Sequence, residues 1–148
     1  MRVYLGPLVA LSLMLALSGC GDDDSSFSPT VENVAGDYSA SVFTLDVGAG
    51  VINQLVQGAS VEVTLAPHGT TTGRLFLPGG GENGADLDAD LAGTWSLSRG
   101  AVTFDQPSET FIRNVRFEAD RNRLIGEDWS GHQVISLVLQ KTEVAARQ

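Results

Sequence analysis

Three aspartates at alternate positions, Asp86, Asp88 and Asp90, are the side chains whose spacing comes nearest to that of a metal site. Carboxylate oxygens at this spacing can converge on Ca²⁺. An EF-hand loop that began at Asp86 would need Gly at position 91 and Glu at position 97, and both positions are Leu. We therefore expect a solvated acidic loop here, with a weak calcium site as the alternative.

The other side chains that could do chemistry are scattered. The two histidines, His68 and His132, fall in predicted turns, and their spacing does not pair them for zinc. No G-x-S-x-G turn presents a nucleophilic serine, and the glycines at 79–81 lack the Gly-Lys-Ser/Thr ending of a phosphate-binding loop. We expect no enzymatic activity, no catalytic residue and no cofactor.

The sole cysteine, Cys20, lies where an apolar run gives way to three aspartates. The run at 3–17 follows Met1 and Arg2, and a basic start before an apolar run is typical of a secretory signal. The run is shorter than the roughly 20 residues that a membrane-spanning helix needs. A lone cysteine in an exported protein needs an explanation, because it has no disulfide partner within the chain.

The residues before this cysteine complete a four-residue pattern, Leu17-Ser18-Gly19-Cys20. It resembles the lipobox of bacterial lipoproteins, in which an aliphatic residue and two small residues precede the cysteine. The resemblance implies that residues 1–19 are a cleaved signal peptide and that Cys20 is lipidated, which anchors the protein in a membrane. In lipoproteins of Gram-negative bacteria, Asp directly after the cysteine favours the inner membrane, whereas this chain has Gly21. We expect a lipid-anchored envelope protein in the outer membrane; a plain secretory signal or an uncleaved anchor is the alternative.

The rest of the chain divides into a tether, one folded domain and a tail. Polar residues at 20–33 predict a flexible acidic and serine-rich tether. Residues 34–142 contain short β-branched and aromatic runs separated by Gly, Pro, Asn and Asp, which is typical of strands joined by turns. Residues 143–148 form the C-terminal tail. A chain of 148 residues, 43% apolar, is long enough for one domain with its own core.

Eight runs are predicted as strands: Gly36–Asp46, Ala59–Ala66, Thr70–Leu77, Leu91–Arg99, Ala101–Asp105, Thr110–Ala119, Arg123–Trp129 and Gln133–Lys141. Helical periodicity is scarce, and we interpret residues 51–56, between glycines, as a loop or lid. Many short strands joined by tight turns, with no crossover helices, indicate an antiparallel meander. Closing such a meander removes its exposed edges. We therefore expect an all-β fold, an antiparallel up-and-down eight-stranded β-barrel.

Two triplets resemble the G-x-W motif of lipocalins: Gly93-Thr94-Trp95 and, in a similar form, Gly36-Asp37-Tyr38. In that family the motif opens the first strand, its aromatic residue plugs the floor of the barrel, and a distant basic residue packs over it. By position in the chain Tyr38 is the counterpart, and by residue type Trp95 is. The resemblance implies a lipocalin-like barrel with one of these side chains as its plug.

Arg113 is the candidate for the basic residue over that plug. Its position alternates with Phe111, Val115 and Phe117, so a regular strand that buries these side chains would also turn Arg113 inward. An inward arginine could stack on Trp95 or Tyr38. The alternative is a local bulge that turns Arg113 outward to solvent.

The charge and the fold together limit the function. A formal charge of −9, with no basic stripe, argues against a nucleic-acid partner. We expect the membrane as a partner through the lipid anchor, and a small barrel that binds a small hydrophobic ligand. The alternative is a non-enzymatic protein-interaction or structural envelope lipoprotein with a filled barrel, for example an inhibitor-like one. A lined pocket inside the barrel would favour the first function, and closed packing would favour the second.

Overall fold

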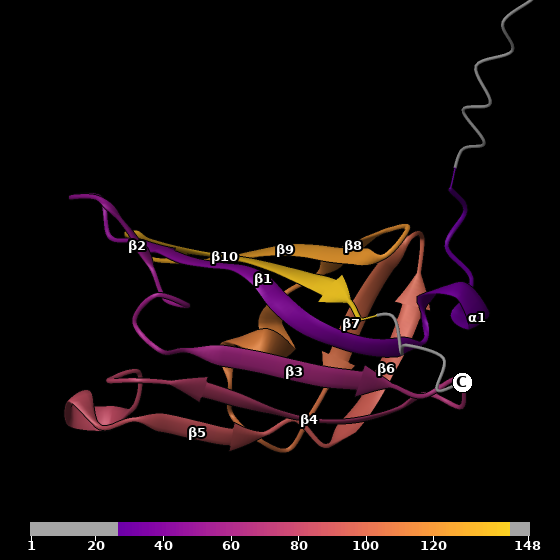
Figure 1. Ribbon diagram of the computed structural model, residues 1–148, viewed down its shortest axis with the longest axis horizontal. Helices are drawn as coiled ribbons and strands as arrows, with labels where there is room; N and C mark the ends of the chain where they lie inside the picture. The colour runs from indigo at the N-terminus through magenta and orange to yellow at the C-terminus, as the bar shows by residue number, and fades with distance from the viewer. Residues whose placement is uncertain (1–26, 143–148) are drawn as a thin grey trace, which may run out of the picture.

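The computed structural model describes residues 27–142 (Figure 1). The predicted signal peptide at 1–19, the lipidated Cys20 and the C-terminal tail at 143–148 lie outside the described residues. Within 27–142, no helix combines the length and the apolar character needed to cross a bilayer.

One short helix, ten strands and two 3₁₀ turns make up this part of the chain. In order they are α1 (Val31–Val34), β1 (Gly36–Asp46), β2 (Val51–Asn53), β3 (Ser60–Leu65), β4 (Thr70–Leu77), η1 (Glu82–Gly84), β5 (Leu87–Asp90), β6 (Gly93–Ser98), β7 (Ala101–Asp105), η2 (Phe111–Asn114), β8 (Phe117–Asp120), β9 (Arg123–Ser130) and β10 (Gln133–Lys141). Helix α1 lies partly within the range predicted as tether, and a capping box between Thr30 and Asn33 fixes its start.

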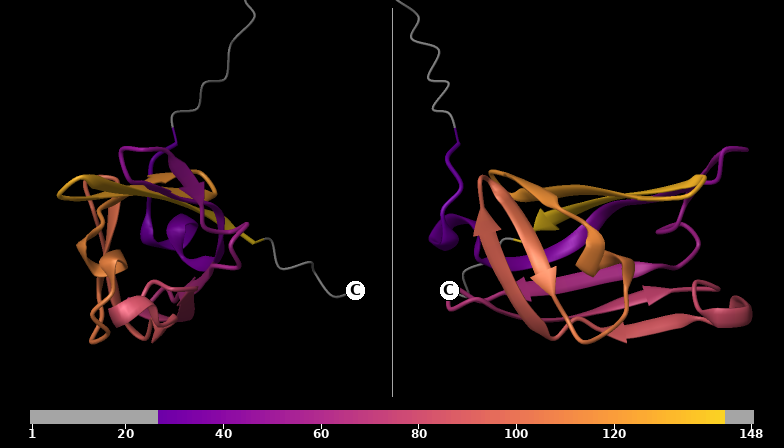
Figure 2. Two further views of the ribbon diagram at one scale, coloured as in Figure 1. Left: turned by 90° about the vertical axis from the view of Figure 1, so that its left-hand side faces the viewer. Right: turned by 180° about the vertical axis from the view of Figure 1, so that it is seen from behind.

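Eight of the strands close into a ring. The antiparallel pairings run from β1 through β3, β4, β6, β7, β8 and β9 to β10, and β10 pairs with β1 to complete the barrel (Figure 2, left panel). The predicted all-β fold with a closed, eight-stranded antiparallel barrel is confirmed. Strands β2 and β5 stand outside this ring, β2 along the last residues of β1 and β5 along the last residues of β4.

The eight predicted runs correspond to the eight strands of the ring, but three segments differ from the prediction. Residues 51–56, interpreted as a loop or lid, begin with strand β2. The acidic loop contains strand β5. The predicted strand at 110–119 is wrong over its first part, because η2 occupies Phe111–Asn114 and β8 begins only at Phe117.

The segment before β8 closes a weak place in the barrel wall. Strands β7 and β8 pair over only two residues, so the wall needs another cover there. The Gln106 side-chain amide donates to the Leu91 backbone oxygen at 2.8 Å, and the Ser108 hydroxyl donates to the Asp90 backbone oxygen at 2.6 Å. Phe111 of η2 then packs against Phe43 with ring centroids 5.6 Å apart.

Inward side chains from every strand of the ring fill the barrel as one hydrophobic core. Its largest fully buried members include Phe43, Phe117, Leu65, Leu75, Leu124, Leu137 and Leu139. Packing is close enough to exclude even a methyl group at Gly126 of β9. A Cβ there would lie 2.3 Å from Val115 Cγ1 and 2.8 Å from Phe117 Cδ1, well inside van der Waals contact.

The barrel has two ends of different construction. At the α1 end lie helix α1 and the turns β3–β4, β6–β7 and β8–β9, and residue 27, where the described chain begins, is also on this side (Figure 1). At the β2 end lie the β1–β2 turn, η1 and the β9–β10 turn (Figure 1).

Candidate functional site

Tyr38 plugs the α1 end of the barrel. Its side chain is 2% exposed, and its hydroxyl donates to the backbone oxygen of Val34 in α1 at 2.6 Å. Burial raises the pKa of Tyr38 to about 12, because the phenolate would lose its hydration there. The helix thus closes the floor over a neutral tyrosine.

Trp95 is buried near the same end. It is 6% exposed, and its indole Nε1 donates to the Ala66 backbone oxygen, in the turn after β3, at 2.8 Å. Tyr38 and Trp95 belong to one core, and each has its polar atom satisfied. Both residues that the lipocalin resemblance singled out are therefore core side chains.

Arg113 does not pack over either ring. It lies on η2 and is exposed, so the inward orientation is wrong and the outward alternative holds, through a 3₁₀ turn rather than a bulge. The turn breaks the two-residue period, and Ile112 is buried in its place.

Lys141, the last residue of β10, is the cation over the floor. Its Nζ lies 6.0 Å from the centroid of the Tyr38 ring and donates to the Asn33 backbone oxygen at 2.9 Å. Gly36 provides the space for the Lys141 side chain, since a Cβ at position 36 would lie 2.4 Å from Lys141 Cε. Sequence reasoning missed Lys141, although it is the only lysine in the chain and ends a predicted strand.

The three aspartates of the calcium candidate hold separate structural roles. Asp86 accepts from the Gly79 backbone N–H at 2.9 Å, and Asp90 accepts from the Ala92 N–H at 2.9 Å. Asp88 forms a two-point ion pair with Arg74 across β4 and β5, and this hydrogen bonding lowers the pKa of the carboxyl. Among residues 27–142, no three acidic, histidine or cysteine side chains come together as a metal site would require.

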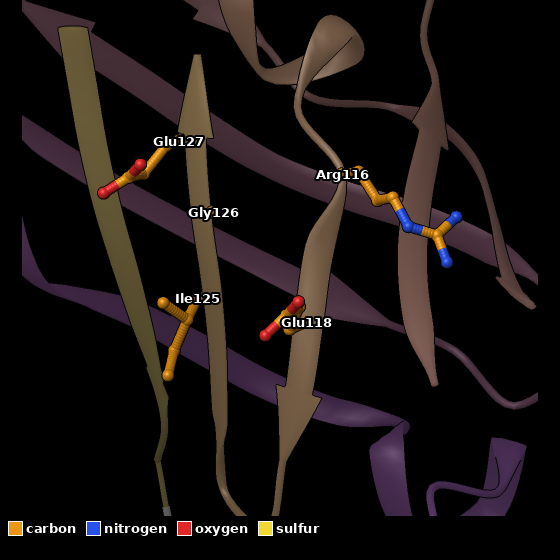
Figure 3. A pocket seen from close by; sticks show the side chains of 5 residues that line it. All are labelled: Arg116, Glu118, Ile125, Gly126 and Glu127. Carbon is orange, nitrogen blue, oxygen red and sulfur yellow. The ribbon is translucent and has the colours of Figure 1, made fainter. Parts of the chain in front are cut away.

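Shallow hollows mark the surface of residues 27–142, and four of them have volumes of about 230 to 320 Å³. The hollow in Figure 3, of about 320 Å³, lies on the outside of β8 and β9, and its charged lining residues are Arg116, Glu118 and Glu127. Ile125 supplies its apolar side chain. The other three hollows are also lined mainly by outward-facing polar residues of the strands, and they too are surface features.

The outer surface of the barrel carries exposed apolar side chains among polar ones over β9, β10, β1 and β2. Directly paired residues of antiparallel strands project to the same side. One row across the four strands is therefore Val51, Asp46, Val134 and Trp129, from β2 to β9. Trp129 is 73% exposed and Val51 is 66% exposed.

Two more rows continue this face toward the α1 end. The next outward row is polar: Asn53, Thr44, Ser136 and Glu127. The row after it is aliphatic, with Val42, Val138 and Ile125, of which Val42 and Ile125 are exposed. We call these three rows the outer face. Sequence alternation could have placed Trp129 on the outward side of its strand, opposite the buried Leu124 and Gly126, but not the residues of the other strands that share this face.

Comparison with family models, curated proteins and solved structures gives no match for this chain. The arrangement of its own residues therefore carries the functional argument.

Proposed function

We propose that this chain is a lipid-anchored protein of the bacterial cell envelope whose lipocalin-like barrel is filled and acts through its outer surface. In this proposal it is a non-enzymatic interaction or structural module. The anchor rests on the lipobox-like residues 17–20, and Gly21 after the cysteine favours the outer membrane.

The filled interior is the observation that carries the proposal. Small-molecule sites usually need about 300 Å³ of enclosed, mostly apolar space. Here the inward side chains form one buried cluster, and the backbone at Gly126 touches Val115 and Phe117 so closely that a methyl group has no room. The hollows described above open on the outside, where polar side chains line them.

The lipocalin-like part of the proposal is supported by the α1 end. A glycine and an aromatic residue open the first strand, the aromatic side chain plugs the floor, and Lys141 from the last strand lies over it. These features correspond to what the G-x-W resemblance implies, with lysine as the basic residue.

Titration with the apolar dye N-phenyl-1-naphthylamine tests whether the barrel accepts a ligand. We expect no saturable increase in dye emission with the folded protein. A saturable increase that competes with fatty acids would instead favour the carrier function. Fractionation tests the anchor separately: the Cys20→Ser variant should leave the membrane pellet, and its persistence there would contradict lipid anchoring.

A further inference from the structure

We infer that the outer face binds a partner protein through a segment that combines arginine or lysine with aliphatic or aromatic side chains. This inference rests on the proposed function and names the surface and the chemistry of the partner. It follows from three features of the β2 end, namely exposed apolar area, the sign of the surrounding charge and position.

The exposed apolar side chains of the outer face do not contribute to the core of the barrel. Trp129 contributes no side chain to the core and is 73% exposed on the outward side of β9. Val134 lies next to Trp129 in the same row, and Val51 stands at the far end of the row on β2, beyond Asp46. Large exposed aromatic side chains with aliphatic neighbours are typical of protein interfaces, where tryptophan is among the commonest energetic anchors.

Carboxylates surround this apolar area and decide which partner it fits. Asp46 stands inside the first row, Glu127 in the second, and Glu118 beside Ile125 at the margin. The two guanidinium groups near this margin are engaged elsewhere: Arg116 donates to the Ser98 backbone oxygen at 3.3 Å, and Arg123, two residues before Ile125, pairs with Asp120. Negative groups interleaved with apolar ones favour a basic and apolar partner segment and repel acidic ones.

The same charges argue against two other occupants. In a symmetric dimer, a second copy would place the same carboxylates against this face. Such pairing of identical acidic surfaces is repulsive. An anionic membrane surface would be repelled in the same way. The outer face also reaches the β2 end, opposite the end at which the described chain begins, so a tether attached there would leave it accessible (Figure 1).

Site-specific photocrosslinking in the native cells tests the inference on the full-length protein. The probe is p-benzoylphenylalanine in place of Val51, which leaves Trp129 intact, and the matched control carries it in place of Glu62, an exposed residue of β3. We expect a protein adduct from position 51 and none from position 62, and we expect the crosslinked segment, sequenced by mass spectrometry, to contain arginine or lysine beside apolar residues.

Variants then tie the adduct to the named side chains. With the probe at position 51, Trp129→Ala should lower the adduct yield by about thirtyfold, as loss of an anchor residue does. Asp46→Asn with Glu127→Gln should lower it about tenfold, because both carboxylates lose their charge while keeping their hydrogen-bonding oxygens. Unchanged emission of the buried Trp95 in these variants would show that the barrel still folds.

Other outcomes overturn the inference in recognisable ways. An adduct with a second copy, with lipid, or with an acidic segment would each refute the basic partner. Adducts from position 62 alone would refute the outer face but leave the proposed interaction function standing. Absence of protein adducts from both positions, together with dye binding inside the barrel, would refute the proposed function itself.

Discussion

The aromatic side chains at the two ends of the barrel differ in their exposure to solvent. At the α1 end Tyr38 and Trp95 are buried, and each donates its hydrogen bond to a backbone oxygen. At the β2 end Trp129 is exposed beside Val134, and Asp46 and Glu127 lie on the same outer face. An aromatic residue with a buried, satisfied polar atom is explained by stability, whereas an exposed one calls for another explanation. The difference explains the α1 end by stability and is the reason that the proposed recognition surface is placed at the β2 end.

The largest expected effect is at Trp95. Trp95→Ala should lower the free energy of unfolding by about 3–5 kcal/mol, because it removes a buried aromatic side chain and leaves a cavity. Chemical denaturation followed by circular dichroism measures this. An unchanged unfolding midpoint would break the comparison, since Trp95 would then not be part of the floor.

Tyr38 should make the α1 end sensitive to alkali. Its folded-state pKa of about 12 lies above the ordinary value of 10, so the folded chain holds the phenol proton more tightly than the unfolded chain does. The corresponding stability is fully present below pH 10 and falls by about 1.4 kcal/mol per pH unit between pH 10 and 12. Denaturation across this range in the wild-type chain and in Tyr38→Phe measures the effect.

The phenylalanine variant is the control for this titration. It lacks the ionisable group, so the part of the alkaline loss that comes from Tyr38 should disappear. Equal losses in both proteins would show that Tyr38 ionises as freely in the folded chain as in the unfolded one.

Gly126 tests how full the barrel is between its two ends. Gly126→Ala should cost about 1–3 kcal/mol, because the added methyl group meets Val115 and Phe117. The neighbouring Glu127→Ala, on the outward side of the same strand, is the matched control and should change the stability by less than about 0.5 kcal/mol. A neutral or stabilising Gly126→Ala, measured by the same denaturation, would reveal free space in the interior.

The smallest expected effect on stability is at Trp129. Trp129→Ala should change the free energy of unfolding by less than about 0.5 kcal/mol, since an exposed side chain gives up little on unfolding. In the wild-type chain, acrylamide should quench the long-wavelength emission of the exposed Trp129. In the Trp129→Ala variant, the remaining emission of the buried Trp95 should be nearly unaffected by acrylamide. A loss of stability as large as that of Trp95→Ala would show that Trp129 supports the fold and would remove the case for recognition.

The strands of the ring were predictable because their residues and turns have a clear local pattern. The period of two over Phe111, Arg113, Val115 and Phe117 was misleading, because a 3₁₀ turn that buries Ile112 produces a similar spacing of apolar residues. No local pattern shows that the wall between β7 and β8 needs a cover, since that depends on the register of distant strands.

The contacts of the candidate site could not be predicted from the sequence for the same reason, because they depend on the register between strands. The contact between Tyr38 and Lys141 arises because β10 closes the barrel against β1, which joins residues from the two ends of the domain. The outer face likewise appears only when Val51, Asp46, Val134 and Trp129 are aligned across four strands. Sequence alternation gives the side of one strand on which a residue lies, but not its neighbours on the next.

Native mass spectrometry of the protein purified from its own cells without unfolding tests the filled barrel most directly. We predict that the folded chain carries no non-covalently bound molecule. An apolar molecule that stays with the folded chain and leaves only on unfolding would contradict the filled interior, and with it the assignment of function to the outside of the barrel.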